Sequence, residues 1–202
     1  MTAPEGFAHD RYLVDQLVRP IANLYRITPL AAGETPLGGP VAFVRQKKMA
    51  IKEDIRFFAD ESESQELFRL KARSILDTGG SRYDVAEAGG EQIGVLHHVL
   101  RKSLFRSTWE VSGANGATAI AHERSLPMAI ARRLVDFVPY GEWVPIPYNF
   151  DILLDDRVVG HMNRKFQLRD RYVLDLTGDH ERQVDRRLAI ALAIGLDALQ
   201  NR

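Results

Sequence analysis

The chain has 202 residues and carries 27 basic and 27 acidic side chains, so it has no net charge, and it contains no cysteine. Without a basic excess it is not expected to bind nucleic acid in general. The lack of cysteine excludes disulfides, zinc–thiolate sites and cysteine nucleophiles. The length suits one domain better than two, and we predict a single domain over residues 1–202.

The N-terminal sequence MTAPEGFAHDRYLVDQ has neither the basic start nor the apolar core of a secretory signal peptide. No window of about 18 apolar residues exists, so we expect no membrane-spanning helix. These features predict a cytoplasmic protein, with peripheral membrane association left open. Residues 8–18 are predicted to form a helix that ends before Pro20, which makes residues 1–20 an N-terminal helical extension.

The segment that follows is rich in predicted strands. Val41–Arg45 is a short β-rich run after the turn signal PLGGP, and Ile51–Phe58 is a second such run. Between residues 67 and 76 charged side chains alternate with other residues, which is the period of a half-buried strand. The acidic sequence DESESQE at residues 60–66 is predicted to be a solvated turn between these strands.

Three later segments share the pattern of an aromatic residue, an aliphatic residue two positions on, a turn and a returning strand. Tyr83, Trp109 and Phe150 hold the aromatic position, and Asn115-Gly116 is the strongest of the three hairpin turns. Packing in a barrel core explains the three aromatic residues better than a ligand pocket does. The predicted apolar pattern of the returning strands comprises Ile93 and Val95, Thr118 and Ile120, and Val158 and Gly160.

Two further helices are predicted. Leu126–Val138 has Pro127 in its first turn and stops before Pro139. The last helix contains the uninterrupted apolar run LAIALAIGL, and a helix that is apolar all round must be enclosed by protein or lipid. At about 1.5 Å per residue this run is too short for a hydrocarbon core of about 30 Å, so we expect protein to enclose it. The predicted core residues of this helix are Leu188, Ile190, Leu192, Ile194 and Leu196.

The order of these elements predicts the architecture. Antiparallel hairpins must protect their edge strands or close into a barrel. A closed barrel of about twelve strands leaves an interior too wide for its own side chains to fill, and a short apolar helix would fill it. We therefore predict a mainly β fold: a closed antiparallel β-barrel of about twelve strands around a buried hydrophobic C-terminal helix, with one or two short extra helices.

Four segments carry a family resemblance: VAFVRQK, RYDVAEAGGEQIGVLHH, STWEVSGANG and the ending RYVLDLTGD...DRRLAIALAIGLDAL. Together they resemble the tubby C-terminal-like superfamily, in particular its LURP-one-related and phospholipid-scramblase-like branch, over Leu24–Gln200. The resemblance implies a barrel wrapped around a hydrophobic C-terminal helix. It implies no single activity: tubby domains bind phosphoinositides, scramblase relatives are membrane-associated, and LURP-one-related proteins lack an agreed biochemical role.

The chain departs from the scramblase relatives in three ways. It lacks their cysteine-rich palmitoylation stretch. Gly195 and the short apolar run fit a buried plug better than a membrane insert. The acidic residues near the last helix are scattered among basic ones and do not form a calcium-binding loop; they are Asp170, Asp175, Asp179, Glu181 and Asp185.

Basic residues cluster at several places in the sequence. An anionic lipid or phosphoinositide headgroup could bind such residues, each contributing about 1 kcal/mol near a membrane surface. Charge for solubility and edge protection is the simpler explanation, because equal numbers of acids are interleaved. If the basic residues form a lipid-binding patch, its members are predicted to be Lys47, Lys48, Arg101, Lys102, Arg164 and Lys165.

No pattern predicts catalysis or metal binding. His97 and His98 are adjacent, so in a strand they face opposite sides and cannot both hold one ion. No usual metal-ligand spacing occurs, and no nucleophile elbow, P-loop or G-x-G-x-x-G sequence follows a predicted strand. We expect no metal, no cofactor and no catalytic residues, so the chain is predicted not to be an enzyme.

The predicted function is a non-enzymatic binding or scaffold module that associates with anionic phospholipid or phosphoinositide headgroups at a barrel rim. Two alternatives remain open. One is a protein–protein interaction module without lipid affinity. The other is an unrecognised hydrolase or small-ligand carrier, which would need a deep polar pocket.

Overall fold

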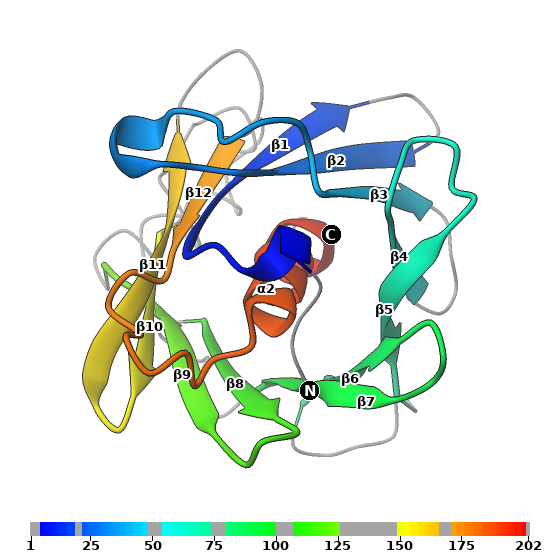
Figure 1. Cartoon of the computed structure of the whole chain (residues 1–202). Coiled ribbons are helices and arrows are strands. Elements are labelled where there is room, and N and C mark those ends of the chain that lie inside the picture. The colour runs from blue at the N-terminus through cyan, green and yellow to red at the C-terminus, as the bar shows by residue number, and fades with distance from the viewer. Residues whose placement is uncertain are drawn as a thin grey trace, which may run out of the picture.

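A computed structural model describes residues 5–18, 22–47, 54–73, 80–99, 107–125, 149–165 and 171–200. Twelve antiparallel strands in these residues form a closed barrel, in which successive strands pair and β1 closes the ring against β12 (Figure 1). The strands are β1 (Arg11–Val18), β2 (Ala22–Pro29), β3 (Ala42–Lys47), β4 (Asp54–Phe58), β5 (Glu66–Ala72), β6 (Arg82–Glu87), β7 (Gln92–His98), β8 (Thr108–Gly113), β9 (Thr118–Glu123), β10 (Phe150–Leu154), β11 (Arg157–Lys165) and β12 (Arg171–Asp175).

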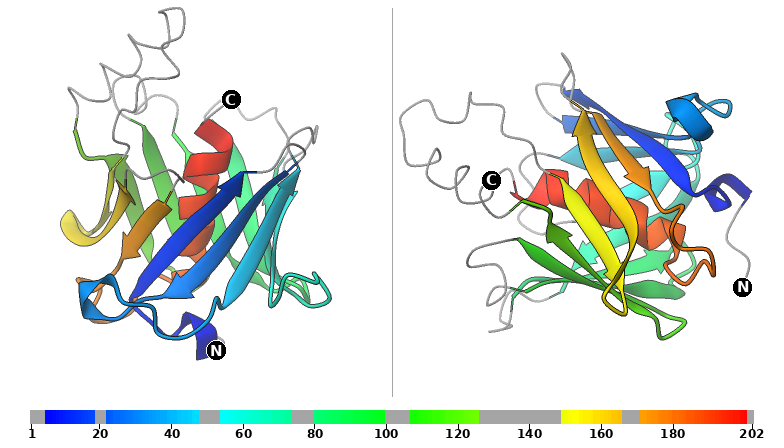
Figure 2. Two further views of the ribbon diagram at one scale, coloured as in Figure 1. Left: turned by 90° about the horizontal axis from the view of Figure 1, so that it is seen from above. Right: turned by 90° about the vertical axis from the view of Figure 1, so that its left-hand side faces the viewer.

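One helix, α2 (Arg186–Gln200), runs lengthwise through the barrel (Figure 2). We call the end of the barrel at which α2 begins the entry end; β1 begins there and β12 ends there. The opposite end is the exit end, where β3 and β11 end. Two short 3-10 segments, η1 (Glu5–Phe7) and η2 (Ala32–Glu34), belong to the entry end. The predicted barrel with a C-terminal helix inside it is confirmed.

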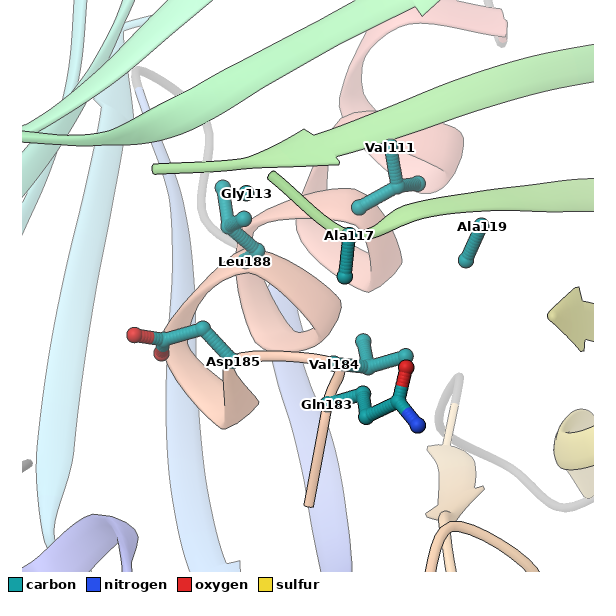
Figure 3. A pocket seen from close by; sticks show the side chains of 8 residues that line it. All are labelled: Val111, Gly113, Ala117, Ala119, Gln183, Val184, Asp185 and Leu188. Carbon is teal, nitrogen blue, oxygen red and sulfur yellow. The ribbon is translucent and has the colours of Figure 1, made fainter. Parts of the chain in front are cut away.

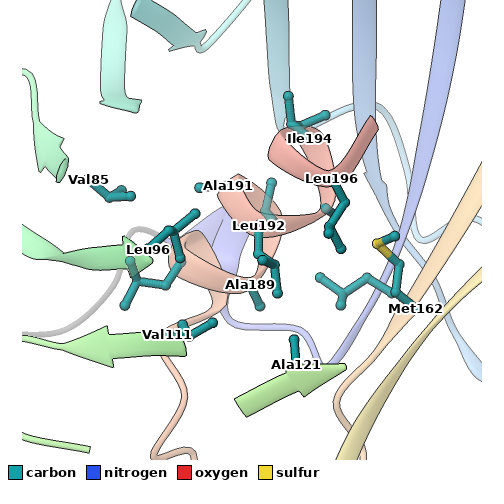
Figure 4. Packing of buried hydrophobic residues seen from close by; sticks show 14 of the residues in the cluster. Val85, Leu96, Val111, Ala121, Met162, Ala189, Ala191, Leu192, Ile194 and Leu196 are labelled. Carbon is teal, nitrogen blue, oxygen red and sulfur yellow. The ribbon is translucent and has the colours of Figure 1, made fainter. Parts of the chain in front are cut away.

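The helix is buried on every side along its apolar run. Its five predicted core residues are each at most 2% exposed, and α2 packs against β7, β8 and β12 (Figure 4). Small residues make this close packing possible. A Cβ atom at Gly94 of β7 would lie 2.3 Å from the backbone oxygen of Ser112 and 2.6 Å from Cδ1 of Leu188, so a larger residue would disturb both the sheet and its packing against the helix.

The three predicted hairpins are present as β6–β7, β8–β9 and β10–β11. Their aromatic residues point into the core, since Tyr83, Trp109 and Phe150 are 6%, 1% and 0% exposed. The turn of β10–β11 has Asp155 and Asp156 at φ 49° and 61°. Two consecutive positive φ values are typical of the tight turns that match the twist of paired strands.

The returning strands face the core with only some of the residues predicted: Ile93 is 3% exposed, but others point outward. In β8–β9, Ala121 lies opposite Trp109, so Ala119 and Ala121 point inward and are 2% and 0% exposed, whereas Thr118 is exposed. Residues directly opposite each other in an antiparallel pair share a face. Alanine is suited to these positions because α2 leaves little room beside them. Val158 of β11 is likewise 45% exposed, and its neighbour Val159 is buried.

The predicted N-terminal helix at residues 8–18 is wrong, and so is the helical extension over residues 1–20. Arg11–Val18 is strand β1, which pairs with β12 on one side and β2 on the other. Tyr12 and Val14 alternate with more exposed residues and are fully buried, which is the period of a strand. Pairing on both sides overrides the weak helical pattern. The predicted helix Leu126–Val138 lies outside the described residues.

Two arginines at the start of α2, Arg186 and Arg187, are buried at the entry end. Arg186 is 3% exposed, and its guanidinium binds the carboxylates of Asp179 and Asp10. The Asp179 carboxylate also accepts hydrogen bonds from the backbone N–H groups of Gln183 and Val184, at 3.0 and 2.9 Å. This carboxylate therefore orders the segment leading into the helix and balances the charge of Arg186.

Arg187 makes a second buried contact at the same end. Its Nη1 lies 2.6 Å from Oε1 of Glu87 at the end of β6, and its Nη2 lies 2.7 Å from Oδ2 of Asp185. Asp185 also caps the helix, since its Oδ1 accepts a hydrogen bond from the N–H of Arg187 at 2.8 Å. Positive side chains are unfavourable at a helix N-terminus. The surrounding carboxylates remove that penalty and attach α2 to the barrel wall.

Candidate binding surface at the exit end

The predicted basic residues that the structure describes lie at the exit end. Lys47 is the last residue of β3, and Arg164 and Lys165 are the last two of β11. Between these strands lie β2, β1 and β12, so four steps of about 4.8 Å separate them by about 19 Å around the rim. They are too far apart to surround one small anion. The other predicted residues, Lys48, Arg101 and Lys102, lie outside the described residues.

Arg164 is held in place by its surroundings. Its backbone N–H donates a hydrogen bond to Oδ1 of Asn149 at 2.9 Å. Its guanidinium carbon lies 6.0 Å from the centre of the Tyr172 ring, which is a cation–π contact. Tyr172 is only 2% exposed, so the ring is itself fixed. The guanidinium is thereby positioned at the exit end by a rigid neighbour.

A row of charged residues continues from this point across three strands. Lys165 of β11 lies opposite Arg171 of β12, which in turn lies opposite Asp15 of β1. Arg171 Nε lies 3.0 Å from Oδ1 of Asp15, so part of the charge of this arginine is balanced. The row leaves a positive balance at the rim.

The entry end has the opposite charge. Arg182 is the one lysine or arginine in the described connections at that end, which cover residues 5–10, 30–41, 59–65, 88–91, 114–117, 155–156 and 176–185. The acidic residues of the same connections are Glu5, Asp10, Glu34, Asp60, Glu61, Glu63, Glu91, Asp155, Asp156, Asp179, Glu181 and Asp185. Arg11, Arg157, Arg186 and Arg187 also lie at this end, at the starts of β1, β11 and α2, and the acidic residues still outnumber the basic ones. The entry end is therefore acidic, although the chain as a whole is neutral.

At the exit end we consider the two residues of each strand that lie closest to that end and, where it is described, the adjoining residue outside the strand. Among these residues, basic side chains outnumber acidic ones. The acids there are Asp54, Asp151 and the buried Glu123. Some of the bases are paired, as Arg73 is with Asp84 at 2.6 Å. The basic residues at the exit end are Lys47, Lys71, Arg73, Arg82, Arg124, Arg164, Lys165 and Arg171. Charge is therefore separated along the barrel axis, with basic residues at the exit end and acidic residues at the entry end.

Asp151 of β10 lies on the outer wall near the exit end. Its Oδ1 lies 2.7 Å from Nε of Arg124 and 2.8 Å from Nδ1 of His161, so the carboxylate links β9, β10 and β11. Burial acts to raise the pKa of Asp151, but the hydrogen bonds from Arg124 and His161 outweigh it and hold that pKa below its ordinary value. The group is a structural ion cluster that depends on pH.

Because the pKa of Asp151 is lower in the folded than in the unfolded protein, its contribution to stability is present above the ordinary carboxyl pKa of about 4 and is lost as the pH falls. We expect Asp151→Asn to lower the free energy of unfolding by about 1 kcal/mol at pH 7. The difference from the wild type should shrink toward pH 3. Urea denaturation between pH 3 and 7 measures it, with the exposed Glu91→Gln as a matched control. A difference that is independent of pH would contradict this account.

Two adjacent histidines belong to strand β7 in the wall of the barrel. His97 and His98 do point to opposite sides, as predicted: Nδ1 of His97 lies 3.4 Å from Oε2 of Glu110, and the His98 ring packs 4.8 Å from that of Trp109. Among the described residues, no group of three histidine, aspartate or glutamate side chains could hold a metal ion.

The interior offers little room where it is described. A pocket between α2 and the β8–β9 hairpin has a volume of about 10 Å³, and Val111, Ala119, Asp185 and Leu188 are among the residues that line it (Figure 3). Such a space holds about one water molecule. The helix occupies the place in which a barrel of this size would hold a ligand.

The family model described as LURP-one-related matches residues 41–197, from the start of β3 into α2. The chain belongs to the LURP-one-related family. This family is part of the tubby-like superfamily, as the resemblance implied. No curated protein matches the chain in sequence. In the described part of this LURP-one-related chain, no helix has the length and apolar character needed to cross a membrane.

Sequence reasoning missed the buried ion pairs at the entry end. In the sequence, Asp179 is one of several acidic residues scattered among basic ones, and Arg186 and Arg187 stand directly before the apolar run. One signal was available, because two arginines directly before an apolar helix place positive charge at its N-terminus, where it is unfavourable without acidic partners. The partners Asp10 and Glu87 are far away in the sequence and meet the arginines only in the closed barrel.

Proposed function

We propose that this LURP-one-related domain is a non-enzymatic binding module whose exit end docks on an anionic phospholipid surface. The observation that carries the proposal is the separation of charge along the barrel axis, with basic strand ends at one end and acidic connections at the other. Such a separation turns the basic end toward a negative surface before contact and raises the rate of encounter.

The geometry favours a broad surface over a single small ligand. Lys47 and Lys165 are about 19 Å apart around the rim, which suits several headgroups rather than one. Arg164 adds a guanidinium that is already fixed against Tyr172, so less side-chain freedom is lost on binding. The interior is filled by α2, which supports a role for the outside of the barrel.

Strand β11 offers a matched pair of variants to test this surface. Lys165 is at its exit end and the exposed Arg157 is at its entry end. We expect Lys165→Glu to weaken binding to phosphatidylcholine vesicles with about 20% phosphatidylserine at least fivefold, because each basic residue near such a surface contributes about 1 kcal/mol. The same charge reversal in Arg157→Glu should leave binding within twofold. Co-sedimentation between 50 and 300 mM salt measures both.

Binding of the wild type should fall as salt rises and should be absent on pure phosphatidylcholine vesicles. Equal losses in the two variants would indicate that net charge matters and orientation does not, and would contradict docking by the exit end. No binding to anionic vesicles at low salt would remove the lipid proposal and favour a protein–protein interaction module.

A further inference from the structure

A row of arginines crosses the outer wall of the barrel on β2–β5. Arg45 of β3 lies directly opposite Arg56 of β4, which lies directly opposite Arg69 of β5. Arg26 of β2 and Arg45 both contact the loop that connects β4 to β5. Like charges directly opposite each other destabilise a sheet, so this row needs anions beside it.

The anions come from the loop between β4 and β5, residues 59–65, which we call the acidic loop. It folds back over the outer wall, so that Glu63 Oε1 lies 2.7 Å from Nε of Arg45 and Glu61 Oε1 lies 2.6 Å from Nη2 of Arg26. The acidic loop therefore reaches past β3 to β2, two strands away from its own attachment to β4.

The arginines differ in where their acids come from. Arg56 pairs with Asp54 of its own strand at 3.0 Å, and Arg69 pairs with Glu66 of β5 at 3.0 Å. These acids belong to the strands and stay with the wall. Arg26 and Arg45 instead pair with the acidic loop. If the loop moved away, these two guanidiniums would lose those carboxylates.

The acidic loop is ordered within itself but only lightly attached. Asp60 accepts hydrogen bonds from the N–H of Ser62 at 2.7 Å and from the hydroxyls of Ser62 and Ser64. Glu63 has φ 59°, a backbone conformation that residues other than glycine rarely adopt. The side chains of the Arg26–Glu61 pair are 39% and 61% exposed, and exposed ion pairs contribute little to stability.

We infer that Arg26 and Arg45, flanked by Arg56, form a docking surface for an acidic peptide segment of a partner protein, and that the acidic loop occupies it as an internal substitute. The loop is the chemical model of the ligand, with carboxylates two residues apart on Glu61 and Glu63. Two donors of Arg26, Nε and Nη2, lie 2.9 and 2.6 Å from Oε1 of Glu61, and such charge-assisted hydrogen bonds are what an acidic side chain of a partner would make. Since this surface lies on the outer wall of β2–β4, it can fail independently of the exit end.

The test uses the full chain and a fluorescent peptide with the loop's own sequence, ADESESQE, compared with the neutral peptide ANQSQSQQ. We expect Glu61→Gln with Glu63→Gln to increase affinity for the acidic peptide at least tenfold over the wild type in fluorescence anisotropy, because the internal competitor is weakened. Adding Arg45→Gln should abolish the gain, and the neutral peptide should show none.

The matched control is Glu91→Gln with Glu181→Gln, which makes the same charge change at exposed acids of other connections. It should leave peptide affinity within twofold of the wild type. Glu63→Gly provides a second variant, because glycine tolerates the positive φ and removes the carboxylate without threatening the fold. It should bind the peptide more tightly than the wild type.

Equal gains in the two double variants would reduce the effect to net charge and overturn the inference. A gain that survives Arg45→Gln would place the peptide elsewhere and overturn it as well. If the Glu61→Gln, Glu63→Gln variant gained affinity for phosphatidylserine vesicles and none for the peptide, the surface would belong to lipid binding, and the inferred partner would be wrong.

Discussion

Replacing Leu192 with aspartate is expected to unfold the protein. Leu192 lies in the middle of α2 and is 2% exposed, with apolar side chains and barrel strands around it. A carboxylate there would be buried without a partner, which costs roughly 3–5 kcal/mol or more. That is a large share of the about 5–15 kcal/mol that holds a typical domain folded. The expected result is insoluble protein, or loss of a cooperative transition in thermal circular dichroism.

Two other substitutions separate burial from general sensitivity. Leu192→Met keeps the volume and polarity of the side chain and should cost less than about 1.5 kcal/mol. Val158→Asp places the same charge on a residue that is 45% exposed and should leave a folded, soluble protein. A soluble Leu192→Asp variant with a cooperative transition near that of the wild type would mean that α2 is not enclosed by the barrel.

The second large effect is expected from Asp179→Ala. This change removes the carboxylate that pairs with the buried Arg186 and accepts two backbone hydrogen bonds ahead of α2. A buried charge left without any partner costs about 3–5 kcal/mol. Arg186 keeps its second carboxylate, Asp10, whose side chain is 41% exposed, so we expect the free energy of unfolding to fall by about 3 kcal/mol in urea titration. The exposed neighbour Glu181 provides the control, since Glu181→Ala should change stability by less than about 0.5 kcal/mol.

A double substitution tests the mechanism of this loss. If the cost of Asp179→Ala comes from the stranded charge of Arg186, then Arg186→Met in the same chain should recover much of it, because apolar replacements of buried ion pairs are often neutral. The double variant should then lose less free energy of unfolding than the sum of the losses in the two single variants. Additive losses would show that the hydrogen bonds to Gln183 and Val184, rather than the ion pair, account for the effect.

Local sequence patterns were sufficient for the hairpins but did not determine which residues of each returning strand face the core. Tyr83, Trp109 and Phe150 are buried as predicted because an alternating strand has only two faces. The choice between Thr118 and Ala119 depended on the register with β8. Register is set by the turn and by the space that α2 leaves, neither of which a single strand contains.

The candidate surfaces could be predicted only in part. The lysines and arginines were visible in the sequence, but not that Lys47 and Lys165 share one end of the barrel while acids gather at the other. The arginine row depends on pairing among β3, β4 and β5. Residues 11–18 are another example. Their apolar spacing fits a helix or a strand, and they form a strand because they hydrogen-bond to β2 on one side and to β12 on the other.

The sequence by itself determined that a short apolar helix at the C-terminus must be enclosed, and that repeated hairpins must close around it. Both conclusions follow from the cost of exposing apolar area and unpaired strand edges, which local patterns reveal. The tertiary structure alone decided which charges meet. Asp10 meets Arg186 and Glu61 meets Arg26 across long stretches of chain, because barrel closure and register set the distances on which electrostatic contacts depend.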